Sequence, residues 1–224
     1  MRNLLHAGFT RLWKSSVFWV EFLFFTVFGV FERVMLYWDG KIGSEFHALE
    51  ENFCVYTLFI GIAMAVFCGL FIGTEYSDGT IRNKIVVGHT RSAVYLSNLI
   101  VCTSAGLLFC AGCLLGTLVA GIPLLGFFTD GFLKPLFCVL CSAALTAAYS
   151  ALFVLLTMLC QNKALISVIS ILIAFALLIP AVPIYIRLNQ PKTNDVITYT
   201  EEGEEAAVET AENPLYLDGA KRRA

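Results

Sequence analysis

Charged residues are scarce in this sequence. Lys, Arg, Asp and Glu together make up 14% of its 224 residues, whereas a soluble domain contains about 25%. Hydrophobic residues reach 58%, and the mean hydropathy is +0.77. This composition excludes an ordinary soluble domain and predicts a membrane protein, because a membrane-spanning helix requires about 20 mostly apolar residues. The formal net charge of −2 is too small to indicate nucleic acid as a partner.

Residues for catalysis and for ATP binding are also missing. The sequence contains no glycine-rich phosphate loop of the Walker type, so any ATP that drives this protein must be bound by another chain. His6, His47 and His89 all fall outside the apolar stretches, and no Ser/His/Asp or His-x-x-x-His set is visible. An enzyme working inside the bilayer would place such groups there. We therefore predict a non-catalytic protein with no cofactor of its own.

Eight cysteines offer one alternative to this prediction. The pairs Cys110-x-x-Cys113 and Cys138-x-x-Cys141 have the spacing of zinc ligands. Both pairs lie in apolar stretches, however, where a thiol behaves as a small hydrophobic group. We favour helix packing for them and predict no metal site. Because all the cysteines lie in or beside apolar stretches, no extracellular disulfide framework is predicted.

Five long apolar stretches predict an all-α, polytopic membrane helix bundle occupying residues 17–186. The spans are expected at Val17–Tyr37, Phe53–Gly73, Tyr95–Leu115 or a turn more, part of Phe132–Leu159, and Ala164–Ile186. The first stretch is too long for a cleavable signal peptide and lacks a small-residue cleavage site.

Small residues recur at steps of four within these stretches. They are Gly69 and Gly73, Gly112 and Gly116, and Ala143, Ala147 and Ala151. Such faces allow helices to approach closely. They predict a compact bundle or a dimer interface and do not identify a substrate.

Lysine and arginine are distributed unequally between the connecting loops. One set of loops contains Arg2, Arg11, Lys14, Arg82, Lys84, Arg91 and Lys163, whereas the opposite set contains only Lys41 and Lys134. Because cytoplasmic loops carry an excess of positive charge, we predict a cytoplasmic N-terminus. Five spans then place the C-terminal tail outside.

Residues 1–16 predict an amphipathic helix in the cytoplasmic interface. Leu5, Phe9, Leu12 and Trp13 recur at helical spacing, and the basic residues lie largely off that face. The simpler alternative is that this segment is the cytoplasmic end of the first span.

Three charged residues, Glu21, Glu32 and Arg33, interrupt the first apolar stretch. A charge at the bilayer centre costs roughly 2.5–3.5 kcal/mol on insertion scales. Glu21 lies about one turn inside the stretch, and Glu32 and Arg33 lie near its far end. We favour structural pairing or extension toward the headgroups; contact with a substrate is the alternative.

A compact polar segment, GTEYSDGTIRNKIVVGHTRSAVYLS, separates the second and third spans. Asp78 or Thr80 is expected to cap a short helix, and Gly88 to end it in the left-handed region. Ile81 and Ile85, with or without Val86, would form an apolar face, with Arg82, Asn83 and Lys84 on much of the other face. Two turns of helix alone are marginal in water, so this helix must pack on its own bundle or on a cytoplasmic partner. A solvated loop is the alternative.

The pattern Glu-x-x-x-Gly-Thr-x-(Arg/Lys)-Asn, followed by Gly-x-x-Arg and a Tyr, resembles the ABC-2 type transporter permeases, the membrane subunits of ATP-binding cassette exporters. The matching residues are Glu75, Gly79, Thr80, Arg82, Asn83, Gly88, Arg91 and Tyr95. The resemblance implies that residues 75–93 form a coupling segment that docks on a separate cytoplasmic ATPase subunit, and that residues 1–16 form an elbow helix. The coupling residues would be Glu75, Asp78, Gly79, Thr80, Ile81, Arg82, Asn83, Ile85, Gly88 and Arg91. Glu75 is expected to be held by a basic neighbour such as Arg91.

The same resemblance implies an exporter permease that moves its substrate with the energy of ATP hydrolysed by its partner. It also implies a second permease subunit, identical or different, and a place in the lipid bilayer of a bacterial cytoplasmic membrane. A secondary transporter, a membrane enzyme and a non-transporting, immunity-like scaffold are the alternatives. A secondary transporter would favour ionisable groups at the midplane, broken helices or an internal repeat, and none of these is evident.

The composition changes in residues 187–224. Residues from Thr193 are acidic and contain few apolar side chains, which predicts a solvated, disordered extracellular loop. The run Asn-Pro-x-Tyr-x-x-Gly-x-Lys-Arg from Asn213 resembles one that precedes a sixth span in some of these permeases. A further apolar span is therefore expected beyond Ala224.

Overall fold

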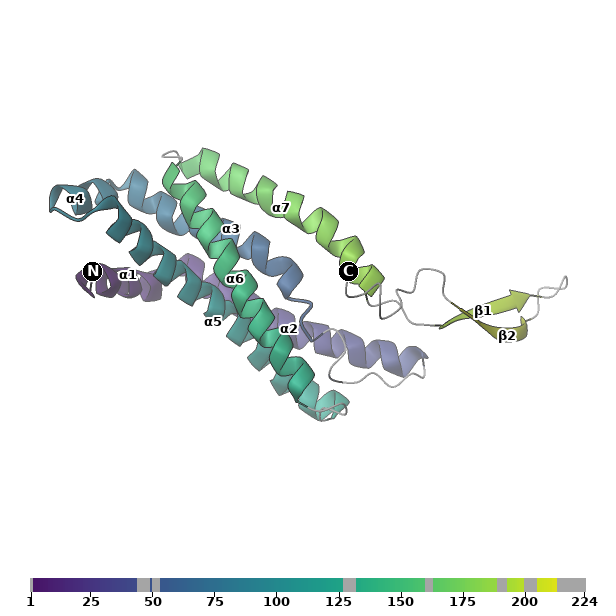
Figure 1. Ribbon diagram of the computed structural model, residues 1–224. Coiled ribbons are helices and arrows are strands. Elements are labelled where there is room, and N and C mark those ends of the chain that lie inside the picture. Colours follow the sequence, from purple (N-terminus) through teal and green to yellow (C-terminus); the bar gives the residue numbers. More distant parts are fainter. Residues whose placement is uncertain are drawn as a thin grey trace. The chain divides into compact units, whose positions relative to one another are not determined.

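The computed structural model describes residues 2–43, 49, 53–126, 132–159, 163–188, 193–199 and 205–212 (Figure 1). It divides into two units, Met1–Phe175 and Ala176–Ala224. The helices are α1 (Arg2–Lys14), α2 (Ser16–Gly43), α3 (Thr57–Ser77), α4 (Thr80–Val86), α5 (Arg91–Leu125), α6 (Leu133–Leu159) and α7 (Lys163–Leu188).

Three of these helices are long and apolar enough to cross a membrane. They are α3, α5 and the part of α6 from Pro135, and α7 contributes a shorter apolar stretch, Val168–Ile184. The predicted second, third and fourth spans are thus confirmed as helices of membrane-spanning length. α5 is longer than expected: its 35 residues extend over about 52 Å, more than the bilayer core of about 30 Å.

α2 has 28 residues and the length to span, but Glu21, Glu32 and Arg33 interrupt its apolar stretch. It is not among the helices that qualify as spans by composition. Its crossing of the membrane therefore stays a prediction.

Phe109 of α5 lies at the centre of an aromatic core. Its ring centroid is 5.7 Å from that of Phe18 and 6.0 Å from that of Phe25, both on α2, and 5.5 Å from that of Phe67 on α3. All four rings are buried. Aromatic pairs at these separations favour stacked and edge-on arrangements, so this cluster joins α2, α3 and α5.

Glycines allow α2 and α5 to pack with their backbones nearly in contact. A Cβ atom on Gly29 would collide with the carbonyl oxygen of Cys113, and one on Gly116 with that of Thr26. A Cβ on Gly112 would lie 2.8 Å from Thr26 Oγ1. The close approach predicted from Gly112 and Gly116 is confirmed.

The buried face of α6 carries hydroxyl groups beside Phe153 and Val154, rather than the predicted alanines. Ser142, Thr146, Ser150 and Thr157 are buried on this helix, whereas Ala147 is exposed. Ser150 Oγ lies 2.6 Å from Thr103 Oγ1 on α5, and Ser142 Oγ lies 2.7 Å from the hydroxyl of Tyr56. In an apolar environment such hydrogen bonds hold neighbouring helices together.

The helical bundle is all-α as predicted, but the C-terminal unit contains a β-hairpin where a disordered loop was expected. β1 (Thr193–Tyr199) pairs antiparallel with β2 (Glu205–Glu212), and Ile197 is opposite Val208. The run Val196–Tyr199 is rich in β-branched and aromatic residues, which favour strands. The acidic composition of the whole tail led instead to the prediction of a disordered loop. The run from Asn213 lies outside the described residues.

Candidate functional site

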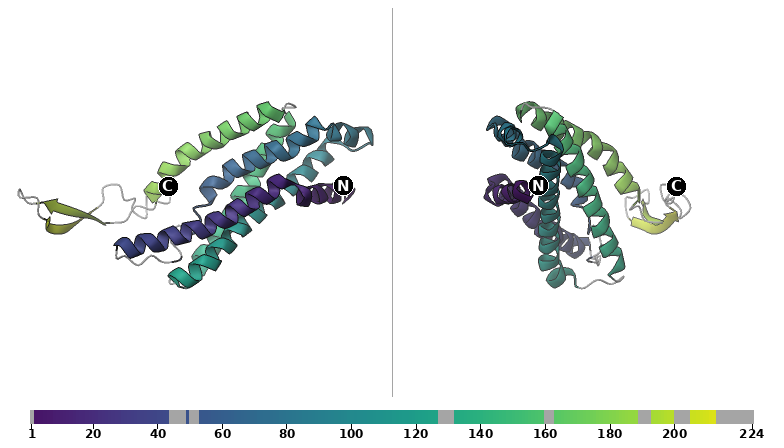
Figure 2. Two further views of the ribbon diagram at one scale, coloured as in Figure 1. Left: turned by 180° about the vertical axis from the view of Figure 1, so that it is seen from behind. Right: turned by 60° about the vertical axis from the view of Figure 1, so that its left-hand side comes forward.

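α4 lies at one end of the bundle, where α3 ends and α5 begins; α1 lies at the same end (Figures 1 and 2). Two glycines with positive φ set its bounds: Gly79 has φ 67° and Gly88 has φ 98°. The amide of Gly88 donates to Ile85 O at 3.0 Å, and that of His89 donates to Lys84 O at 3.2 Å. This is the glycine-terminated end expected at Gly88.

The beginning of α4 differs from the prediction. Gly79 is its N-cap and no side chain caps the helix, while Asp78 is the exposed C-cap of α3. Thr80 Oγ1 donates backward to Glu75 O at 3.0 Å. Only Asp78 and Gly79 separate the two helices, so the chain must reverse through a left-handed residue, and glycine adopts that conformation without strain.

Glu75 lies at the centre of a polar contact between four helices. This α3 residue is 4% exposed, and its Oε1 forms ion pairs with Arg11 of α1 and with Lys84 of α4, whose Nζ is 2.5 Å away. Asn98 of α5 donates its Nδ2 to Oε2 at 3.2 Å. A buried carboxylate requires such partners, so the charge of Glu75 fixes α1, α4 and α5 against the end of α3.

Arg11 makes several contacts at once. Besides its ion pair with Glu75, it donates to the carbonyl oxygen of Phe71, and its Cζ lies 3.8 Å from the centroid of the Phe71 ring. That distance is typical of a cation–π contact. Burial lowers the pKa of the Arg11 guanidinium, and the Glu75 carboxylate opposes this effect. Arginine stays charged throughout the physiological range, so the guanidinium brings a positive charge to this contact.

The packing of α1 also differs in part from the predicted face. Leu4 and Leu12 are buried, but Trp13 is 53% exposed. A Cβ on Gly8 would lie 2.8 Å from Val101 Cγ2 of α5. One side of α1 thus packs on α5 while Trp13 faces outward, and the location of α1 in the membrane interface stays a prediction.

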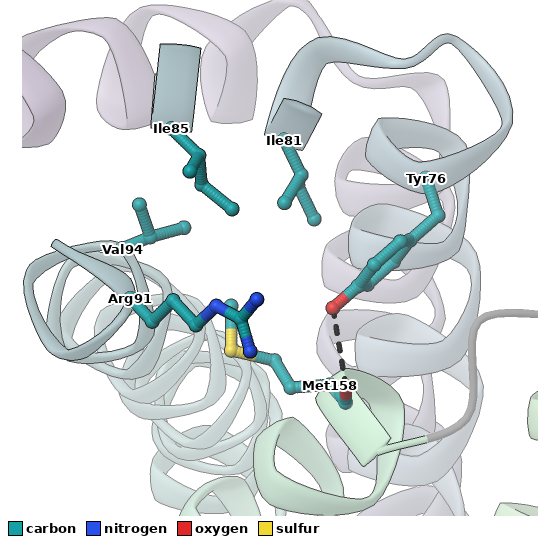
Figure 3. A pocket seen from close by; sticks show the side chains of 6 residues that line it. All are labelled: Tyr76, Ile81, Ile85, Arg91, Val94 and Met158. Atoms are coloured by element: carbon teal, nitrogen blue, oxygen red, sulfur yellow. Dashed lines mark hydrogen bonds between the residues drawn. The ribbon is translucent and has the colours of Figure 1, made fainter. Parts of the chain in front are cut away.

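Arg91 does not pair with Glu75, contrary to the expectation. Among the described residues, the charged partners of Glu75 are Arg11 and Lys84. The guanidinium of Arg91 lies instead in a separate cavity beside Tyr76, Ile81 and Met158 (Figure 3). Lys84 lies on α4, which places its ammonium group beside Glu75 at the end of α3. Arg91 is the first residue of α5 and follows α4 in the chain.

α4 exposes an apolar surface beside its polar residues. Ile81 is 6% exposed, whereas Ile85 is 40%, Val86 78% and Val87 77% exposed. Arg82 and Asn83 are also exposed. Only one side of this short helix is therefore covered by its own bundle.

A shallow groove of about 360 Å³ runs between α1 and α4. It is lined by Asn3, Leu4, Ala7, Thr80, Asn83, Lys84, Val87 and His89. Together with the exposed residues of α4, it forms a mixed polar and apolar surface at this end of the bundle.

The three charges that interrupt the apolar stretch of α2 differ in their contacts within the described part of the chain. Arg33 is 0% exposed; its Nε and Nη2 each donate to Glu32 at 3.0 Å, and its Nη1 donates to Leu49 O at 3.0 Å. The expected structural pairing is confirmed for these two residues. Both carboxylate oxygens of Glu21 are buried without a hydrogen-bond partner in the described part of the chain.

The cysteine pairs lie on helices. Cys110 and Cys113 are buried in α5, and Cys110 Sγ lies 3.4 Å from Thr146 Oγ1, whereas Cys138 and Cys141 of α6 are exposed. Within the described ranges, no group of three His, Cys, Asp or Glu side chains is placed to hold a metal ion.

Sequence reasoning missed three members of the Glu75 contact: Arg11, Lys84 and Asn98. The one available signal was Asn98, an amide in an apolar stretch, because a polar side chain there requires a hydrogen-bond partner. Arg11 and Lys84 looked like ordinary solvated basic residues.

A family model described as "ABC-2 family transporter protein" matches residues 4–181, from α1 into α7. No curated protein and no solved structure matches the chain.

Proposed function

Because this chain belongs to the ABC-2 family of transporter proteins, we propose that it is the permease subunit of an exporter and that a separate ATPase subunit hydrolyses the ATP. Its apolar helices and its family make it a multi-pass membrane protein. The chain itself would perform no catalysis. The observation that carries the proposal is the buried carboxylate of Glu75, which joins α4 to three other helices.

The ATPase would bind the exposed side of α4. A helix of seven residues is too short to be stable alone, and α4 buries Ile81 but leaves Ile85, Val86 and Val87 exposed. An exposed apolar surface beside a cation, here Arg82, is typical of a protein-binding surface. A partner on that surface would push α4 directly against the contact around Glu75.

The ion pair would transmit this push. Lys84 moves with α4, Glu75 with α3, and Arg11 with α1, so a displacement of α4 reaches two other helices through charged contacts. Two such permease subunits would pair, and closure of two ATPases would change access to the substrate from one side of the membrane to the other.

The positive charges support a cytoplasmic location for this end. Arg11, Lys84 and Arg91 gather at the α4 end of the bundle, which the positive-inside rule assigns to the cytoplasm. The N-terminus would then be cytoplasmic. The resemblance to the permease family separately favours the cytoplasmic membrane of a bacterial cell.

Co-purification tests the docking surface. The double variant Val86→Asp/Val87→Asp places two charges at residues 78% and 77% exposed and should abolish recovery of the ATPase by the tagged permease. The control is Ile42→Asp, which adds a charge at a residue 80% exposed near the end of α2 and should leave recovery unchanged. Normal recovery by the double variant, at equal membrane abundance, would contradict docking on α4.

A further inference from the structure

A second cavity lies beside α4, and Lys84 is not among its lining residues. It has a volume of about 230 Å³ and is lined by Tyr76, Ile81, Ile85, Arg91, Val94 and Met158 (Figure 3). These residues come from the end of α3, from α4, from the beginning of α5 and from the end of α6. The cavity therefore opens where three long helices reach the same end of the bundle.

The lining of this cavity carries positive charge and no negative charge. The Arg91 guanidinium extends into it, and none of the lining residues is acidic (Figure 3). In the part of the chain that the structure describes, Arg91 forms no ion pair, and the nearby carboxylate of Glu75 is already bound by Arg11 and Lys84. The Tyr76 hydroxyl already donates to Met158 O at 3.2 Å. The group in this cavity that a ligand would have to match is therefore the positive charge of Arg91.

The rest of the lining is mainly apolar. Ile81, Ile85, Val94 and Met158 surround the guanidinium (Figure 3). A free inorganic anion would leave these side chains uncovered, whereas an anion attached to a hydrocarbon chain would match both parts. Basic pockets between membrane helices near the surface bind lipid headgroups.

We propose that this cavity binds an anionic phospholipid, with the phosphate at Arg91 and the first part of an acyl chain against Ile81, Ile85, Val94 and Met158. Arginine suits this role because its planar guanidinium donates two parallel hydrogen bonds to a phosphate. The lipid would fill the space between α4 and the ends of α5 and α6. The helix α4 would thus be held both by a carboxylate of the protein and by a lipid.

The test uses the purified permease alone, so its outcome does not depend on the proposed ATPase partner. The protein is placed in nanodiscs of phosphatidylcholine, with or without phosphatidylglycerol, and its thermal unfolding is measured. Lipids that stay bound after transfer to detergent are identified by native mass spectrometry. Phosphatidylglycerol should raise the Tm of the wild-type protein, whereas inorganic phosphate added to phosphatidylcholine discs should not.

Three variants test whether the lipid binds in this cavity. Arg91→Gln should weaken retention of phosphatidylglycerol about tenfold, as expected for loss of a charge-assisted contact. Met158→Trp fills the cavity, keeps Arg91 and should have a similar effect. Arg82→Gln removes an exposed cation that does not line the cavity and should retain the lipid. Equal retention by Arg91→Gln or Met158→Trp and by the wild-type protein would overturn the proposal, as would equal loss in Arg82→Gln.

Discussion

At the residue scale, Glu75 connects four helices through one carboxylate. It is a single carboxylate, 4% exposed, with two cations and one amide around it. Removing one member of a buried charge network costs more than the net energy of the network, because the remaining charges lose their partners. Arg11 and Lys84 are partly exposed, so water would compensate part of that loss.

Reversal of this charge should therefore be disruptive and partly reversible by a second change. Glu75→Lys places a third cation beside Arg11 and Lys84 and should lower the free energy of unfolding by about 2–4 kcal/mol. Glu75→Lys combined with Lys84→Glu restores one opposite-charge pair and should recover part of that loss. Denaturant unfolding of the purified protein in micelles gives both values. If Glu75→Lys is as stable as the wild-type protein, the buried contact is absent.

The sequence predicted the short helix α4 but not the side chains that contact Glu75. The position of α4 and its end at Gly88 followed from local patterns, because a glycine with positive φ acts within one turn. The partners of Glu75 did not. Arg11 is far away along the chain, and Lys84, although closer to Glu75 in sequence than Arg91 is, was assigned to the polar face of α4. Which cation reaches a carboxylate depends on how helices pack, and that information is not local.

At the element scale, the bundle depends on the contact between α2 and α5. Their approach is set by Gly29 and Gly116, which leave no room for a side chain. The sequence predicted the role of Gly116 from its spacing to Gly112, but Gly29 has no small partner four residues away and was not singled out. The hydroxyl-bearing face of α6 was likewise missed, because the alanines beside it fitted the same spacing.

Gly116→Leu should separate α2 from α5. The new side chain would collide with the backbone at Thr26, and overpacking of this kind costs at least about 1–3 kcal/mol. We expect a large loss of monodisperse protein in fluorescence-detected size-exclusion chromatography. The control is Val119→Leu on the same helix, at a residue 71% exposed, which should behave as the wild-type protein does. A normal elution profile for Gly116→Leu would show that the two helices are further apart.

At the scale of the whole molecule, the orientation in the membrane decides what α4 can contact. Composition alone predicted the helices of the bundle, since apolar length is a property of each stretch. It did not predict the hairpin β1–β2, where a short β-branched run outweighs an acidic composition. Orientation rests on the distribution of Lys and Arg and requires its own experiment.

Cysteine labelling of whole cells tests the orientation. On a cysteine-free background, Ser77→Cys at the end of α3 should be protected from an impermeant thiol reagent, and Ile42→Cys near the end of α2 should react. Both residues are exposed, so burial does not explain a difference between them. Reaction at Ser77→Cys with protection at Ile42→Cys would invert the orientation and place α4 out of reach of a cytoplasmic ATPase.

The central claim is that the Glu75 contact transmits the action of the ATPase into the bundle. The most direct measurement is the rate at which Ile42→Cys, near the end of α2, reacts with a thiol reagent in the permease–ATPase complex, with and without a non-hydrolysable ATP analogue. With Glu75 intact, the analogue should change this rate. In Glu75→Gln the complex should still form, because Ile85, Val86 and Val87 are unaltered, but the rate should no longer respond to the nucleotide. An unchanged nucleotide response in Glu75→Gln, at equal recovery of the ATPase, would contradict the account.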